Sequence, residues 1–241
     1  MKTLTALFFV FALAVSSTQA QQQETIKGNG QIVTQKRTLG SFGKLNVRVG
    51  MRVKITAGDA ASAELEGESN ILEHVLTDVK NGELTVTFAP NKSFNQTKGV
   101  VVTIHVPKLD QVMVSTGCSV DSDLPIQAST LTATVETGSS LTAPINAKTL
   151  KLAVKQGSKA NLTGTVADAD IELEGAGKLN AEKLTIARAD VRLEGASRAD
   201  IHVTETLSAA ADGVSTINYT GNPTVKSEQA TGLSKIRKQG K

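Results

Sequence analysis

The chain has 241 residues, with 26 basic and 23 acidic side chains and a formal net charge of +3 at pH 7. A charge this balanced predicts neither a nucleic acid nor an anionic membrane surface as the partner. Tryptophan is absent, 3% of the residues are aromatic, and one cysteine cannot form an internal disulfide. The frequent Val, Ile, Thr and Gly residues favour an all-β fold.

The N-terminus has the features of a secretory signal peptide. Lys2 precedes an apolar run from Leu4 to Val15, and small or polar residues follow it up to Ala20. A run of this length is too short to span a bilayer, and no later stretch of the chain is long enough. The sequence therefore predicts a signal peptide over residues 1–20 and no integral membrane segment. We expect an exported protein of the periplasm, the cell surface or the extracellular space.

Residues 21–110 contain short runs in which apolar and polar side chains alternate, as in strands with one buried face. The apolar positions are Leu45, Val47, Val49, Val53, Ile55, Leu84, Val86, Phe88, Val102, Ile104 and Val106. Asn81-Gly82 is a strong signal for a two-residue hairpin turn. Because an open sheet edge invites pairing with other chains, we expect this segment to be a β-rich N-terminal capping domain that covers the repeats after it.

A glycine recurs with nearly constant spacing in the second half of the chain. The glycines are Gly117, Gly138, Gly157, Gly175, Gly195, Gly213 and Gly232, with spacings of 21, 19, 18, 20, 18 and 19 residues. A period of about 20 residues is typical of a solenoid, whereas propeller blades need about 40. No helical periodicity persists across these repeats. The glycines therefore predict corners that lie along one edge of a stack of coils.

Apolar residues alternate with period two on both sides of these glycines, which predicts a strand before and after each corner. The inward positions are Ala133, Val135, Leu152, Val154, Ile171, Leu173, Val191, Leu193, Ala209 and Ala211, then Leu141, Ala160, Leu179, Ala199 and Ile217. We predict that residues 111–236 form a parallel β-helix, or β-solenoid, of about seven short coils. Residues 237–241 form a basic tail that, with Asn222-Pro223, blunts the last coil.

Several short motifs resemble a known family, "putative auto-transporter adhesin, head GIN domain", common in exported proteins of Bacteroidetes. The motifs are Gly28-Asn29-Gly30, Phe42 before Leu45-Asn46-Val47, Val106-Pro107-Lys108-Leu109, the repeated glycine corners, and Tyr219-Thr220-Gly221-Asn222-Pro223. The resemblance covers nearly the whole mature chain. It implies two β-solenoid-like portions and a role in adhesion.

Three residue types are candidates for chemistry but have simpler structural explanations. Cys118 aligns on the corner glycines with Ser139, Ser158, Ala176, Ala196, Val214 and Leu233. A column of mostly small residues favours packing over a catalytic thiol. The column Ser119, Ser140, Ser197, Ser215 and Ser234 is expected to satisfy backbone groups at the corners. His74, His105 and His202 lack metal-ligand spacing and are expected to be surface strand residues.

Outward charges align in two columns of the predicted solenoid. One column is Glu136, Lys155, Glu174, Glu194 and Asp212, and beside it stand Lys151, Asp170 and Asp190. Like charges about 4.8 Å apart repel unless a cation or solvent screens them. One hypothesis is weak Ca²⁺ binding by the four carboxylates Asp170, Glu174, Asp190 and Glu194, and a solvated acidic face is the alternative.

The sequence predicts no catalytic, cofactor-binding or metal-binding residue, no cofactor and no enzymatic activity. The leading hypothesis is a cell-envelope adhesin or scaffold that binds an unidentified protein or glycan through a flat β-face. The alternative is a polysaccharide-binding or polysaccharide-degrading β-helix protein, because β-helices can carry carboxylates on one face. The scarcity of aromatic residues counts against sugar stacking. Homo-oligomerisation through the sheet faces is a third possibility.

Overall fold

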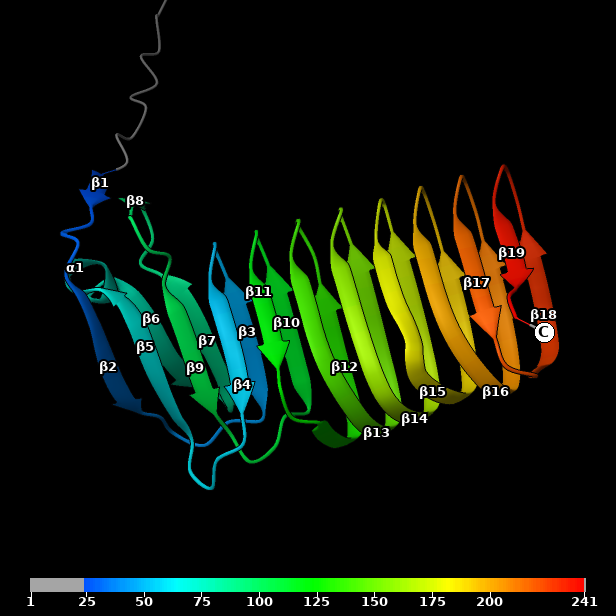
Figure 1. The fold of residues 1–241 in the computed structure, drawn as a ribbon, viewed down its shortest axis with the longest axis horizontal. Coiled ribbons are helices and arrows are strands. Elements are labelled where there is room, and N and C mark those ends of the chain that lie inside the picture. Colours follow the sequence, from blue (N-terminus) through cyan, green and yellow to red (C-terminus); the bar gives the residue numbers. More distant parts are fainter. Residues whose placement is uncertain (1–23, 241) are drawn as a thin grey trace, which may run out of the picture.

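The computed structural model describes residues 24–240, so the predicted signal peptide lies outside the described residues. Strands stack along the longest axis of the molecule, and each turn of the chain around this axis is a coil (Figure 1). In the described residues the strands form one 17-stranded sheet and one two-stranded sheet. The predicted all-β solenoid of about seven coils is confirmed.

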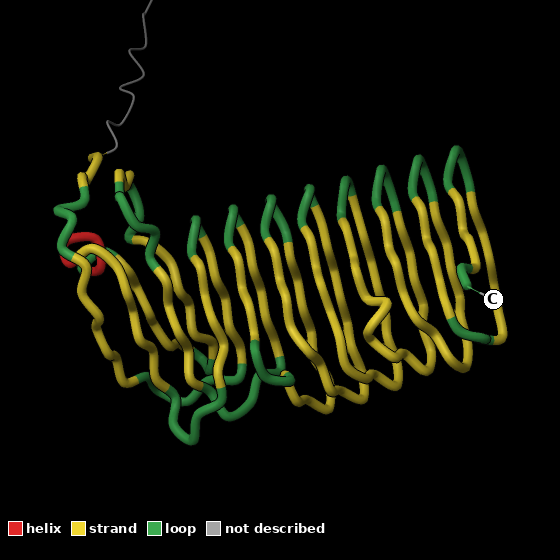
Figure 2. The backbone as a smooth tube through the Cα atoms, in the orientation of Figure 1, coloured by secondary structure: helices red, strands yellow, loops and turns green. Residues whose placement is uncertain are grey.

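Ten strands form the predicted repeats, and neighbouring coils pair in parallel. They are β10 (Gln111–Ser115), β11 (Ser119–Ser122), β12 (Ile126–Val135), β13 (Ser140–Lys155), β14 (Lys159–Glu174), β15 (Lys178–Leu193), β16 (Arg198–Ala211), β17 (Thr216–Thr220), β18 (Thr224–Ala230) and β19 (Lys235–Lys238). The glycine turns, here called narrow corners, form the upper edge in Figure 2. The bends at the opposite edge are called wide corners.

The inside of the coils is a narrow stack of aliphatic side chains. All the inward residues predicted from the repeat are buried, from Ala133 through Ile217. In β13 the buried positions alternate as far as Ala147 and resume at Leu150, so Lys148 and Thr149 are two non-buried residues in succession. This single skip in the alternation bends the strand at the wide corner while its pairing with the next coil continues.

The narrow corners are two-residue turns of two kinds. In the earlier ones both residues have positive φ, as in Gln156 (53°) and Gly157 (73°), which is the type I′ pattern. From Gly175 (72°) onward the glycine comes first and the second residue no longer has positive φ, which is the type II′ pattern. Because Lys155 pairs with Glu174, Gly175 aligns with Gln156. The predicted glycine edge is therefore two adjoining columns.

The stacked coils continue toward the N-terminus beyond the segment in which the repeat was predicted. β3 (Lys44–Arg48) pairs with β10, and β4 (Arg52–Thr56) pairs with β11, both in parallel. Val49 and Gly50 make the narrow corner between them, with φ of 63° and 68°. Val49 was expected to share the inward alternation, but it is 47% exposed because it occupies the corner. The parallel pairing thus crosses the predicted boundary at residue 110.

Antiparallel strands close the N-terminal end of the stack. β7 (Glu83–Phe88) and β9 (Val101–His105) still pair in parallel with β3 and β4. β2 (Ile32–Thr38), β5 (Ser62–Glu68) and β6 (Val75–Lys80) then add antiparallel pairings. We call β2, β5, β6 and the helix α1 (Ser69–Leu72) the N-terminal cap. The predicted Asn81-Gly82 hairpin is confirmed, since it joins β6 to β7 with positive φ at both residues.

A buried carboxylate fastens the start of the described chain to this cap. Glu68 is 0% exposed. It accepts hydrogen bonds from the backbone N–H of Gly30 (2.7 Å) and from the backbone N–H (3.0 Å) and hydroxyl (3.1 Å) of Thr97. A side chain at Gly28 would collide with this carboxylate. The Gly28-Asn29-Gly30 motif therefore leaves room for Glu68 and supplies a donor to it. Nearby, β1 (Glu24–Lys27) pairs with β8 (Lys92–Asn95).

Among residues 24–240, none forms a comparable cover at the C-terminal end of the stack. Within this range β18 pairs only with β16, and all seven of its residues are exposed, while β19 pairs with β17. Glu228 aligns with buried Ala209, and Lys238 aligns with Tyr219. The last coil thus carries charges at positions that hold apolar or aromatic side chains in the coil before it.

Candidate functional site

The outer face of β12 to β16 between the wide and narrow corners carries the charged columns predicted from the sequence. Lys151 pairs with Asp170, which pairs with Asp190, and Lys155 pairs with Glu174. We call this the acidic face, because eight acidic side chains and four basic ones lie in residues 130–136, 149–155, 168–174, 188–194 and 206–212.

Ion pairs between neighbouring coils compensate much of the negative charge on the acidic face. Lys155 lies 2.9 Å from Glu174 and 3.5 Å from Glu172. Arg192 lies 3.6 Å from Asp170 and 3.0 Å from Asp190. The hydrogen bond to Glu174, followed by the charge of Glu172, raises the pKa of Lys155, and the same contact lowers the pKa of Glu174.

These cations lie beside three of the four carboxylates that the calcium hypothesis assigned to a metal. Asp170 and Asp190 share Arg192, and Glu174 has Lys155. Within residues 24–240, no three His, Cys, Asp or Glu side chains converge in a way that could hold a metal ion. The geometry therefore gives the calcium hypothesis no support.

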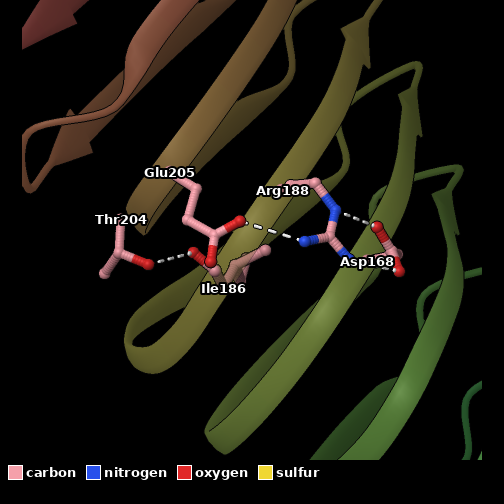
Figure 3. A network of polar contacts seen from close by, with 5 residues as sticks. All are labelled: Asp168, Ile186, Arg188, Thr204 and Glu205. Atoms are coloured by element: carbon pink, nitrogen blue, oxygen red, sulfur yellow. Dashed lines mark hydrogen bonds and ion pairs between the residues drawn. The ribbon is translucent and has the colours of Figure 1, made fainter.

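A further arginine on the acidic face joins three successive coils. Arg188 donates to both carboxylate oxygens of Asp168, at 2.6 and 2.9 Å, and to Glu205 at 3.0 Å (Figure 3). The hydrogen bonds to the two carboxylates raise the pKa of Arg188, and those of Arg188 lower the pKa of Asp168. Bidentate contacts hold the planar guanidinium in one orientation. The face is therefore an ordered array of charges.

The opposite face carries a ladder of amides that the sequence analysis did not identify. Asn180 donates to Asn161 (2.8 Å), and Asn161 donates to Thr142 (3.3 Å). Farther along, Asn218 donates to Asp200 (2.7 Å). The recurrence of these residues two positions after Ser140, Lys159, Lys178, Arg198 and Thr216 is the sequence signal that could have revealed the ladder.

The inner side of the narrow corners contains a column of small polar side chains. Met51 donates its backbone N–H to the sulfur of Cys118 (3.3 Å), and Cys118 donates to the hydroxyl of Ser139 (3.2 Å). Ser197, Ser215 and Ser234 continue the same pattern, with distances of 3.3 and 3.1 Å. The serines satisfy backbone groups, as expected.

The membership of this serine column differs from the prediction. Ser119 and Ser140 lie in the neighbouring outward column, and Ser139 and Ser158 take their places. The reason is the change of turn type at Gly175, because an alignment on glycines slips by one residue there. Cys118 is 3% exposed, and burial raises the pKa of its thiol. A protonated, buried thiol is a poor nucleophile.

The three histidines are partly buried, and the structure does not bring them together. The ring of His105 lies 2.8 Å from the hydroxyl of Thr56, and that of His202 lies 2.9 Å from Thr220. His74 is in a turn after α1 and not in a strand as expected, with its ring 5.8 Å from that of Phe94. Each ring contributes to local packing or hydrogen bonding.

A groove with a volume of about 930 Å³ lies beside the wide corners. At one end it is lined by the loops that follow β4, β9 and β11, which contribute Ala57, Val106 and Leu124, respectively. It continues along the bends of the later coils, past Asn146 and Thr165. The groove was not predictable from the sequence, because loops far apart in the chain build it. The Val106-Pro107-Lys108-Leu109 motif was a signal, but only for the family.

Comparison with known proteins agrees with this architecture. None of the curated proteins is similar enough to count as a match. A "putative adhesin" from Bacteroides fragilis has a TM-score of 0.84 and 20% identity, over 89% of this chain and 100% of that chain. A "putative lipid binding protein" from Parabacteroides distasonis has a TM-score of 0.73 and 16% identity, over 90% of this chain and 100% of that chain. A "putative adhesin" from Parabacteroides merdae has a TM-score of 0.66 and 19% identity, over 90% of this chain and 100% of that chain.

At these identities the solved structures show the fold alone. The family is shown by the sequence itself, because the family model "putative auto-transporter adhesin, head GIN domain" matches residues 41–223. The match includes the strands from β3 to β17 and most of the N-terminal cap, and it ends before β18 and β19. The resemblance predicted from the short motifs is confirmed, and the chain belongs to this family.

Proposed function

We propose that this protein is an exported adhesin or scaffold of the cell envelope, which acts by binding and not by catalysis. Family membership supports an adhesin-like role. The apolar segment and small residues before residue 21 support export. The only helix in residues 24–240, α1, has four residues and is not long enough to cross a membrane.

The observation that carries the proposal is the ordered acidic face. Its strands are held on both sides by parallel neighbours. Arg188 and Arg192 connect carboxylates on different coils, and Lys155 reaches from one coil to two carboxylates on the next. A surface that is already ordered loses little conformational entropy when a partner binds. Charges at fixed spacing also favour a partner with a complementary charge pattern. The partner class is a protein or glycan with basic groups.

The alternative, a polysaccharide-degrading β-helix, is not favoured by the site. Glycoside hydrolysis needs one carboxylic acid and one carboxylate that flank the scissile bond. On the acidic face, Asp168 is paired with Arg188 and Glu174 is paired with Lys155. These pairings lower the pKa of both carboxylates and keep them ionised, which is unsuited to the proton-donating acid.

The test combines location with binding. Protease treatment of intact cells is expected to remove the protein from the surface fraction, and the purified protein is expected to bind host or microbial surfaces without turning over glycans.

An Asp170→Ser, Asp190→Ser double variant should weaken binding at least tenfold. The matched control is Lys159→Ser, Lys178→Ser on the opposite face, which should bind normally. Glycan turnover, or equal binding by both variants, would contradict the proposal.

A further inference from the structure

The groove beside the wide corners has the size and the composition of a ligand site. Its volume of about 930 Å³ is within the usual range of roughly 300 to 1,000 Å³ for small-molecule pockets. Its floor reaches the core, because Ala147 and Val166 line it and are 8% and 1% exposed. The acidic face lies outside the groove, so the adhesion proposal does not use this site.

The end of the groove near the N-terminal cap is aliphatic. Leu124 is 47% exposed there, beside Val106 and Ile126, which are 6% and 5% exposed. Pro107 and Pro125 complete this wall and have no backbone N–H to offer. An exposed leucine in a wall without these donors favours an apolar ligand group, since covering it removes apolar surface from water.

The charged side chains that line the groove are all of one sign. They are Lys108 and Lys148, and no aspartate or glutamate is among the described lining residues. Lys108 is paired with Asp110 at 2.9 Å. Lys148 is exposed on the first bend past the apolar end, and no ion pair with a described residue compensates its charge. The groove therefore offers one cation next to an aliphatic wall.

The remaining lining residues narrow the class of ligand. None of the lining side chains in the described part of the chain is aromatic, so these residues provide no ring on which a sugar or a planar ligand could stack. Beyond Lys148, the groove continues past Thr165, Thr185 and Thr204, one from each of three coils. These hydroxyls suit the polar end of a ligand, whereas Leu124 suits an alkyl chain.

We propose that this groove binds a single anionic amphiphile, a monomeric long-chain carboxylate, with the alkyl chain against Leu124 and the carboxylate at Lys148. The site takes one molecule and not a bilayer surface, because its floor is formed by residues that are almost completely buried. The proposal is independent of the proposed adhesive function, because the two use different parts of each coil.

Calorimetric titration of the purified protein with oleate, below its critical micelle concentration, tests the apolar half of the site. Saturable binding of one oleate per chain is expected. Leu124→Glu should weaken it at least tenfold, because it places a like charge in the aliphatic wall. Val214→Glu is the matched control, since Val214 is 61% exposed at a narrow corner outside the groove. No saturable binding, or equal loss in both variants, would overturn the proposal.

The charged half of the site is tested with a pair of ligands. Lys148→Gln should weaken oleate binding about tenfold and leave the binding of uncharged methyl oleate unchanged. Lys151→Gln, on the same strand but outside the groove, should bind both ligands normally. Equal effects of Lys148→Gln on the acid and the ester would refute the role of the lysine. Cosedimentation with anionic vesicles that persists in Leu124→Glu would instead show surface adsorption, which also contradicts the proposal.

Discussion

The two ends of the solenoid are closed by different physical means. At the N-terminal end, antiparallel strands and α1 add further buried apolar residues, including Leu65, Ile71 and Val75. At the C-terminal end, β18 and β19 leave the last coil open and place Glu228 and Lys238 at inward positions. One end gains stability from burial, and the other avoids pairing with a further chain through inward charges. The same sheet architecture can thus end with or without a cap.

The largest expected effect on stability comes from an apolar truncation in the cap. Leu65→Ala should lower the free energy of unfolding by roughly 2 to 5 kcal/mol, because Leu65 is 0% exposed and its removal leaves a cavity. Val225→Ala in the open last coil should cost less than about 1 kcal/mol, because Val225 is 39% exposed. Urea denaturation of both variants measures the difference. Similar losses would mean that the two ends are equally buried.

The buried carboxylate of the cap should make stability depend on pH. Burial alone would raise the pKa of Glu68, but the backbone N–H groups of Gly30 and Thr97 and the Thr97 hydroxyl together hold it below the usual value of 4.5. Its contribution is therefore complete above the ordinary pKa and is lost as pH falls through the lowered one. Glu68→Gln should melt at a lower temperature than the parent at pH 7, and the gap should narrow below pH 4.5. A gap that is constant with pH would contradict this account.

The serine column allows one substitution to be compared in two environments. Ser139→Ala removes the acceptor of the Cys118 N–H at a site that is 2% exposed, and it should cost about 1 to 3 kcal/mol. Ser234→Ala removes the acceptor of Ser215 in the open coil, where water can replace it, and it should cost at most about 0.5 kcal/mol. Thermal unfolding of both variants provides the measurement. A larger loss for Ser234→Ala would show that the last coil is as tightly closed as the others.

The smallest effect on the stability of the monomer is expected from the charges of the last coil. Replacing Glu228 and Lys238 together by valine should leave unfolding almost unchanged but promote association of chains, because it gives the open edge an apolar inner surface. Light scattering as a function of concentration measures the association. The control is Lys226→Val, which changes a charge in the same strand at the irregular step between the paired residues Val225 and Ser227. Association of the control variant alone would show that the inward position of the charges is not what prevents association of chains.

The repeat was predictable because its signal is local and periodic. The alternation of residues such as Leu152 and Val154, with a glycine every turn, identifies both the inward face and the corner. The earliest coil was missed because β3 and β10, which pair in space, are separated in sequence by most of the cap. The members of the serine column were predicted wrongly because the narrow corners have the same length but place glycine second in the early coils and first in the later ones. An alignment on the glycines is therefore displaced by one residue after Gly157.

The site was less predictable than the fold. The charged columns of the acidic face were predictable from the spacing of the repeat. The ion pairs of Arg188 and Arg192 were not, because they depend on the conformations that these long side chains adopt between coils. The groove depends on loops from three separate parts of the chain, which contribute Ala57, Val106 and Leu124. No period in the sequence connects these residues.

Native-state hydrogen exchange tests the difference between the two ends most directly. Amide protons of β3, β4 and β5 are expected to exchange slowly, close to the rate set by global unfolding, because cap and coils share one buried core. Amide protons of β18 and β19 are expected to exchange much faster, through local opening of the exposed last coil. Equal protection at both ends, or faster exchange in the cap than in β18, would contradict the account.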